Sequence, residues 1–159
     1  MTLAATRPAS WILARVLPYI DRVVLNLTRS RQTATEVLTG LPVLMLTTEG
    51  AITGRRYRTP LVYFREDQKY LLVATKFGQR ENPGWYYNIL ANPEVEVTID
   101  GMTSRYLGNE VIGSDRSNYW EMAVAHYPGY LNFQRRAVNR TIPLLLLSPL
   151  EKTVDEEPE

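Results

Sequence analysis

Two short segments of the chain carry residue types that can bind an anion and a flat ring system. In the first, Gly50 and Gly54 bracket a turn that is followed by arginines at positions 55, 56 and 58. Glycine permits positive φ and leaves backbone N–H groups uncovered, and a guanidinium gives bidentate contacts to phosphate or carboxylate. This pattern predicts either an anion-binding nest or a solvated hairpin whose arginines keep an edge strand soluble. The segment taken alone favours neither.

The second segment, residues 82–88, places an indole, two phenols and an amide at the start of an expected helix. Asn82 is a candidate N-cap with Pro83 as the first helical residue, so the first N–H groups would point toward partial negative charge. Trp85 and Asn88 stand three residues apart and share one helical face. Core packing would explain the aromatic residues equally well, but it does not readily explain Asn88.

Two further sets of residues could contribute hydrogen bonds or protons. Thr75 and Lys76 follow an apolar strand and would bring a hydroxyl and an ammonium to the sheet rim. Tyr127, Tyr130 and Phe133 recur at three-residue intervals, so a helix here would line one side of a pocket, and a phenol can protonate a reduced substrate oxygen. A routine strand end and an ordinary aromatic core are the commoner explanations of these two patterns.

Composition excludes several other kinds of chemistry. The 159 residues are 45% hydrophobic and 22% charged, as expected for one globular domain. There is no cysteine and His126 is the only histidine, so we predict neither thiol catalysis nor a metal site. Residues 1–150 hold 17 basic and 12 acidic side chains, and the last nine residues are acidic. This mildly basic body suits a small anionic ligand and is too weakly charged for a nucleic-acid binder.

The hydrophobic periodicity indicates a mainly β protein with a few helices. We expect strands at residues 42–48, 58–64, 70–75, 94–100, 103–112 and 141–148, and helices at residues 83–92, 115–126 and 130–137. Ser114 is the candidate N-cap of the second of these helices. An antiparallel meander of this size usually closes into a small barrel. Residues 10–28 have the pattern of an amphipathic helix with a cationic side, which favours packing on the domain or a partner over contact with lipid.

Six motifs, in this order from about Leu41 to Leu147, together resemble the deazaflavin-dependent nitroreductase family, whose members use coenzyme F420. Each motif is weak alone, whereas all six in register are specific. The motifs are Leu46-Thr47-Thr48-x-Gly50-x-x-Thr53-Gly54, Thr59-Pro60-Leu61, Val73-Ala74-Thr75-Lys76-x-Gly78, Asn82-Pro83-x-Trp85-Tyr86-x-Asn88-x-x-Ala91-Asn92-Pro93, Tyr127-x-x-Tyr130 and Arg140-Thr141-Ile142-Pro143.

This resemblance implies an α+β, mainly β fold, a split β-barrel of about six or seven mostly antiparallel strands with packed helices. We expect an N-terminal amphipathic segment at residues 1–40, the cofactor-binding barrel at residues 41–150 and a disordered acidic tail at residues 151–159. The implied activity is transfer of a hydride from reduced deazaflavin to a quinone, nitroaromatic or activated enone. The expected location is cytoplasmic, with peripheral contact of the N-terminal helix at the inner membrane face as an open alternative, and the expected state is a monomer or a homodimer.

The resemblance and the charge of the first segment together assign residues to three roles. The expected catalytic residues are Tyr130, Tyr127 and Thr75, and the substrate pocket is Tyr63, Tyr127, Tyr130 and Phe133. The expected cofactor contacts are Ala51, Ile52, Thr53, Gly54, Arg55, Arg56, Tyr57, Arg58, Thr59, Pro60, Leu61, Val62, Val73, Ala74, Thr75, Lys76, Gly84, Trp85, Tyr86, Tyr87, Asn88 and Tyr130.

The chain departs from the family pattern at a few positions. Ala51 and Ile52 stand where a basic pair is usual, Tyr57 stands where an arginine is common, and Phe133 replaces a frequent tyrosine. We expect the neighbouring arginines to compensate at the phosphate. Two other functions remain open at this level: a split-barrel oxidoreductase that uses FMN, and a non-catalytic cofactor carrier or membrane-surface binding protein.

Overall fold

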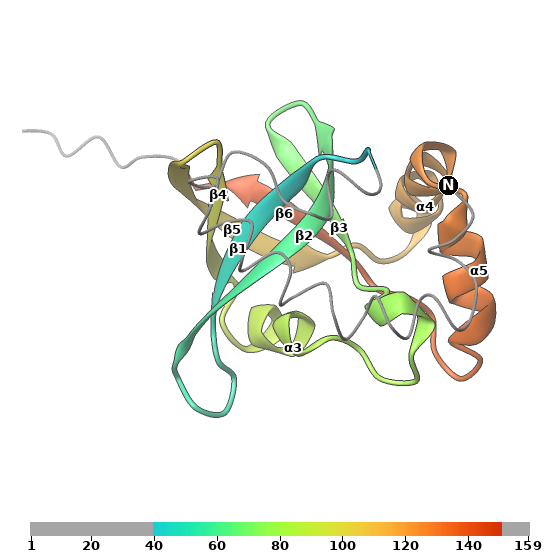
Figure 1. Cartoon of the computed structure of the whole chain (residues 1–159), viewed down its shortest axis with the longest axis horizontal. Coiled ribbons are helices and arrows are strands. Elements are labelled where there is room, and N and C mark those ends of the chain that lie inside the picture. Colours follow the sequence, from blue (N-terminus) through green and yellow to red (C-terminus); the bar gives the residue numbers. More distant parts are fainter. Residues whose placement is uncertain (1–39, 151–159) are drawn as a thin grey trace, which may run out of the picture.

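The computed structural model describes residues 40–150, which form a closed antiparallel β-barrel with helices packed on it (Figure 1). The strand order around the barrel is β1-β2-β3-β6-β5-β4, and β4 closes the circle by pairing with β1. The strands are β1 (Val43–Glu49), β2 (Arg56–Glu66), β3 (Lys69–Val73), β4 (Glu94–Ile99), β5 (Met102–Glu110) and β6 (Leu144–Pro149). The helical elements are the 3-10 turn η2 (Lys76–Gly78) and the helices α3 (Gly84–Ala91), α4 (Ser114–His126) and α5 (Gly129–Arg136).

This architecture confirms the expected mainly β fold and each of the six expected strands. The predicted N-terminal helix at residues 10–28 and the predicted acidic tail lie outside the described residues. Most strand ends differ from the prediction by one to three residues; the largest difference is in the last strand, which begins at Leu144, and the third strand ends at Val73. The helix starts also differ from the prediction. Pro83 and Gly113 are the N-caps of α3 and α4, and neither cap makes a side-chain hydrogen bond.

Alternation of side chains along the strands builds two separate hydrophobic clusters. Inward residues of the barrel form the first cluster, which Trp85, Tyr86 and Ile89 of α3 complete. The outer faces of β2, β3 and β6 form the second cluster, which α4 and α5 cover. Figure 1 shows these two helices side by side against the barrel, with α3 at a different place on its surface. Because β6 belongs to both clusters, its leucines are buried on both faces, which explains its unbroken apolar run.

Tight turns set the register of the hairpins. Asp100 and Gly101, which join β4 to β5, have φ values of 51° and 78°. Positive φ at both central residues is the requirement of a type I′ turn, and an Asp-Gly pair meets it at little cost. The turn fixes Ile99 opposite Met102 and so places the valines of β4 inside the barrel and its glutamates outside.

Candidate functional site

The turn that joins β1 to β2 is closed by its own backbone. The Gly50 N–H donates to the Arg55 carbonyl at 2.7 Å, and the Gly54 N–H donates to the Gly50 carbonyl at 3.0 Å. These two amides are therefore not the uncovered donors that the sequence suggested. Gly54 has the expected positive φ of 66°, but Gly50 does not. A Cβ on Gly50 would lie 2.7 Å from Thr53 Oγ1 and from the Tyr57 ring, so close packing explains that glycine.

Asn88 holds this turn against helix α3. Its side-chain oxygen accepts a hydrogen bond from the Ala51 N–H at 3.0 Å, and its Nδ2 donates to Thr48 Oγ1 at 3.0 Å. Thr48 is almost completely buried. The amide that core packing did not explain in the sequence thus has a structural role, because it satisfies a buried hydroxyl and anchors the turn.

The three arginines of the first segment differ in their surroundings. All three are exposed. Arg56 forms an ion pair with Glu96 on β4, across the intervening strand β1. Within residues 40–150, the side chains of Arg55 and Arg58 form no ion pair or hydrogen bond. The charges of Arg55 and Arg58 are therefore available to an anionic ligand, whereas that of Arg56 is partly neutralised.

The outward face of β2 joins the cationic end of the barrel to the aromatic cluster. Its unbroken register places Arg58, Pro60, Val62 and Phe64 on one face. Val62 and Phe64 belong to the second hydrophobic cluster, and the Phe64 ring lies 6.0 Å from that of Tyr130. At about 3.3 Å per residue, the row from Arg58 to Phe64 spans roughly 20 Å.

The end of strand β3 leads into a left-handed turn. Lys76, Phe77 and Gly78 have φ values of 44°, 54° and 76°. Thr75 caps the turn, because its Oγ1 accepts a hydrogen bond from the Phe77 N–H at 3.3 Å. The Lys76 ammonium lies 3.4 Å from the carboxylate of Glu81, which is itself largely exposed. The hydroxyl and the ammonium expected at the sheet rim are both present there.

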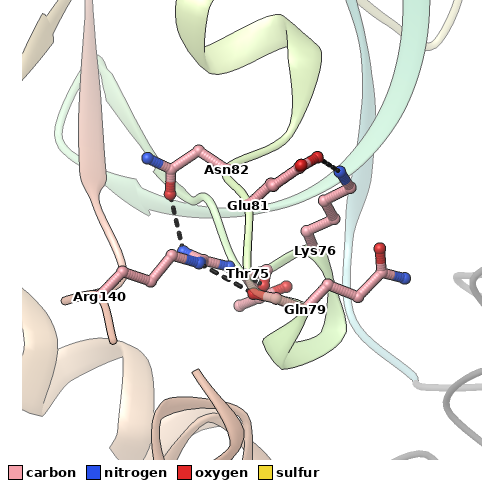
Figure 2. A network of polar contacts seen from close by, with 6 residues as sticks. All are labelled: Thr75, Lys76, Gln79, Glu81, Asn82 and Arg140. Carbon is pink, nitrogen blue, oxygen red and sulfur yellow. Dashed lines mark hydrogen bonds and ion pairs between the residues drawn. The ribbon is translucent and has the colours of Figure 1, made fainter. Parts of the chain in front are cut away.

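Arg140 makes the most extensive polar contacts of this region, and sequence reasoning assigned it no role (Figure 2). Its guanidinium donates to the carbonyls of Ala74 (3.2 Å), Thr75 (2.6 Å) and Gln79 (3.0 Å). It also donates to the side-chain oxygen of Asn82 at 2.8 Å. Burial lowers the pKa of Arg140. The predicted N-cap Asn82 therefore binds this arginine and not the start of α3.

The expected aromatic set is brought together but buried. The ring of Tyr130 lies 5.2 Å from that of Tyr127 and 6.2 Å from that of Phe133. All three are less than a tenth exposed. Desolvation raises the pKa of both phenols above the usual value, so both are protonated at neutral pH. The Tyr127 hydroxyl has no hydrogen-bond partner within the described part of the chain. Tyr63 lies apart from this set, because it packs on Tyr70 against the cluster inside the barrel.

Helix α3 presents less of its aromatic surface than its sequence suggested. Trp85 and Tyr86 are buried in the barrel cluster, and only Tyr87 is substantially exposed. The Tyr86 hydroxyl donates to Glu110 at 2.9 Å, and burial together with that carboxylate raises the pKa of Tyr86 to about 12. Of the predicted contacts on this helix, Gly84 and Tyr87 thus face solvent and the others have structural partners.

Two general features of the described residues bear on the kind of site. Between residues 40 and 150 there is no group of three or more acidic or histidine side chains that could hold a metal ion. In the same range, no helix is both long enough and apolar enough to cross a bilayer. His126 contacts the Met122 carbonyl through Nδ1 at 2.9 Å, and its ring centroid lies 5.1 Å from that of Phe64. Both contacts indicate a structural role for this histidine.

Comparison with known proteins identifies relatives of the whole barrel. Residues 21–149 match the family model described as F420H(2)-dependent quinone reductase. An F420H(2)-dependent quinone reductase of Mycobacterium tuberculosis is 35% identical over 112 residues, which cover 67% of this chain and 73% of the relative. A solved F420-H2 dependent reductase (FDR-A) is 34% identical with a TM-score of 0.61, over 67% of this chain and 94% of that one. Another structure, described as a domain-swapped dimer, is 28% identical with a TM-score of 0.62, over 89% of this chain and 100% of the other.

Proposed function

The chain belongs to the F420H(2)-dependent quinone reductase family, and we propose that it carries out this chemistry at the outward face of strand β2. The protein is accordingly an oxidoreductase whose cofactor is coenzyme F420 and whose acceptor is a quinone. Nitroaromatic compounds and activated enones are further candidate acceptors by the resemblance in the sequence. The location of the site and the roles of its residues are the content of the proposal.

The single observation that supports this location is the continuous row on β2. The cofactor combines a flat tricyclic ring with a phosphate and an acidic tail, so it needs cations at one end of its site and an apolar or aromatic surface at the other. The row offers Arg58 at one end, the half-buried Pro60 and Val62 beyond it, and at the other end the buried Phe64, which contacts Tyr130. Because Arg55 and Arg58 have no ion pair within residues 40–150, a phosphate can bind there without displacing a protein carboxylate.

Each residue of the site would act through charge or hydrogen bonding. Arg55 and Arg58 would neutralise the phosphate and acidic tail, and Lys76, whose ammonium now pairs with Glu81, would add a third charge at the sheet rim when the ligand displaces that carboxylate. Thr75 Oγ1 already accepts a hydrogen bond from the backbone, so its own proton is directed to another acceptor, such as a polar edge of the ring. When bound, the reduced deazaflavin supplies the hydride, and the protein contributes position and electrostatics.

The acceptor needs a proton as well as a hydride. Addition of a hydride to a quinone forms one new bond to hydrogen and leaves a negative charge on oxygen, which a proton must neutralise to give the hydroquinone. We assign proton donation to the Tyr130 phenol because the family resemblance places it over the reacting face, with a water as the alternative donor; burial raises its pKa, so the phenol is protonated at neutral pH. The proton is then replaced from water. Tyr127 would position Tyr130 through their ring contact at 5.2 Å.

Turnover with defined cofactors tests this function. Purified protein is mixed with reduced F420 and menadione, and cofactor oxidation is followed by absorbance at roughly 400–420 nm. We expect menadione-dependent oxidation, and slower proton-limited turnover with Tyr130→Phe. Reduced FMN with the same acceptor is the parallel reaction. Turnover with FMN and none with F420 would contradict the proposal, and tight binding of F420 without turnover would indicate a carrier.

Assembly and membrane contact are separate parts of the proposal. A relative forms a domain-swapped dimer, which supports a homodimer over a monomer for this chain. Size-exclusion chromatography with light scattering would decide between them. The sequence of residues 10–28 favours packing on the domain or a partner over contact with an anionic bilayer. We therefore expect no co-sedimentation of the full chain with anionic or neutral vesicles, and binding to anionic vesicles alone would show peripheral membrane contact instead.

A further inference from the structure

The left-handed turn after strand β3 is an unusual conformation for the residues it contains. Lys76 and Phe77 are consecutive non-glycine residues with positive φ, and Gly78 continues the same hand. An L side chain disfavours this region because its Cβ approaches the following carbonyl oxygen. Such conformations persist only where the surrounding structure holds them, and they concentrate at functional sites. The turn therefore needs an identifiable restraint.

Two contacts restrain it, and both come from the α5 end of the chain. On one side the Phe77 ring packs edge-on against Phe133 of α5 at 5.7 Å. Gly78 fits closely there, because a Cβ on it would lie 2.7 Å from the Phe133 carbonyl oxygen. On the other side the Arg140 guanidinium binds the carbonyls that flank the turn (Figure 2). The turn is thus fixed between an aromatic contact and a polar one.

The contacts of Arg140 fix the backbone path of the segment around the turn. A planar guanidinium has five donors in fixed directions, and four of them bind acceptors on the segment from Ala74 to Asn82. Among the residues described, no carboxylate pairs with Arg140. Three of its partners are backbone carbonyls, so it fixes the path of the chain and not merely one side chain. A lysine ammonium is a point charge that cannot reproduce this arrangement.

We propose that Arg140 is a positioning residue of the cofactor site, because its guanidinium holds the turn that presents the Thr75 hydroxyl and the Lys76 ammonium. This inference rests on the proposed function, since it requires Lys76 to contact the cofactor. Arg140 itself touches the backbone of Thr75, one residue before the ammonium. Through Phe77 and Phe133 the same turn is joined to the helix that carries Tyr130. The contacts of Arg140 therefore affect both the affinity for the cofactor and the position of Tyr130.

Affinity measurements on four variants of the full chain test this inference. The variants are Arg140→Lys, Lys76→Gln, their combination, and Arg105→Lys as a matched control on the outside of β5, where Arg105 pairs with Glu94. The readouts are the F420 Kd by fluorescence titration and the melting temperature. Arg140→Lys should weaken binding about tenfold, within the range of coupling for residues in one network. The control should change binding less than about twofold, as for a surface pair.

The combination separates positioning from a simple loss of stability. If Arg140 acts through Lys76, adding Arg140→Lys to Lys76→Gln should weaken binding less than about twofold further, although the melting temperature still falls. Multiplied losses would overturn the inference, and so would an unchanged Kd in Arg140→Lys. If Lys76→Gln alone leaves the Kd unchanged, the proposed place of the cofactor fails together with the inference. Should Arg140→Lys not fold, Asn82→Ala removes one acceptor only and should weaken binding about threefold by the same route.

Discussion

Replacing Arg58 with glutamine should weaken F420 binding more than the same replacement of Arg56. Both side chains are exposed and lie on the outward face of β2 two residues apart. Arg56 forms an ion pair with Glu96, whereas Arg58 has no ion pair within residues 40–150. An anionic tail that binds Arg58 gains a new charge contact. One that binds Arg56 must first displace Glu96 or accept its repulsion.

The size of the difference follows from the exposure of the pair. A hydrogen bond to a charged group contributes about 1.5–3 kcal/mol when it is well formed, and solvent exposure lowers this to roughly 1 kcal/mol. Loss of the Arg58 contact should then raise the F420 Kd about fivefold. The Arg56 and Glu96 side chains are 65% and 37% exposed, so their ion pair contributes only about 0.2–1 kcal/mol. That competition should limit the effect of Arg56→Gln to about twofold.

Glu96→Gln provides the matched control, because it removes the competing carboxylate and leaves every arginine in place. We expect it to tighten F420 binding about twofold and to reduce the difference between the two arginines. Fluorescence titration at low and at physiological salt gives the dissociation constants of the wild type, the three single variants, and Glu96→Gln combined with each arginine variant, and salt should weaken the Arg58 contribution. A larger loss from Arg56→Gln than from Arg58→Gln, or weaker binding by Glu96→Gln, would refute this reasoning.

Three further changes test the packing that supports the site. Gly78→Ala forces a Cβ against Phe133 at positive φ and should lower the free energy of unfolding by roughly 1–3 kcal/mol in urea, and an unchanged midpoint would exclude the clash. Asn88→Ala releases the β1–β2 turn and leaves a buried hydroxyl unpaired, so urea titration should show a loss of about 1–2 kcal/mol, which a purely exposed amide would not give. Burial and Glu110 raise the pKa of Tyr86 above its unfolded value of 10.0 to about 12, so stability should fall as the pH rises from 10 toward 12. Tyr86→Phe should remove part of that fall, and an identical pH profile for the variant would contradict the assignment.

The strands were predictable because one face of each is buried. In β4 the valines alternate with glutamates, as expected of a strand with one buried face, and Val95 and Val97 lie inside the barrel. The apolar run of β6 also predicts a strand. The predicted strand includes residues 141–143, which precede the start of β6 at Leu144. The double burial of β6 depends on the helices that cover its outer face, which no local pattern specifies.

The polar contacts of the site were harder to predict, because they join residues far apart in the chain. Asn88 and the turn at Ala51 are 37 residues apart, and Arg140 and Ala74 are 66 apart. An asparagine before Pro83 has the local features of a helix cap, yet Asn82 binds Arg140 because that guanidinium lies within reach. Local sequence rules take no account of such a competitor.

The aromatic spacing predicted proximity but not exposure. Tyr127, Tyr130 and Phe133 do contact one another, although only Tyr130 and Phe133 share helix α5 and Tyr127 lies in the link after α4. Whether such a set lines a pocket or fills a core depends on whether side chains from another element cover it. Here Phe64 and Leu144 cover it from the barrel side. The proposed donation by Tyr130 therefore depends on access to its hydroxyl and not on the position of its ring.

Mapping of the F420 contacts by nuclear magnetic resonance would test the central claim most directly. Backbone amide spectra of the labelled protein are compared before and after addition of the oxidised cofactor. The account predicts that the largest shift changes cluster at Arg55 to Val62 on the β1–β2 side and at Thr75 to Gly78 in the left-handed turn. Changes confined to β4 and β5, or scattered without a cluster, would show that the cofactor does not bind along the outward face of β2.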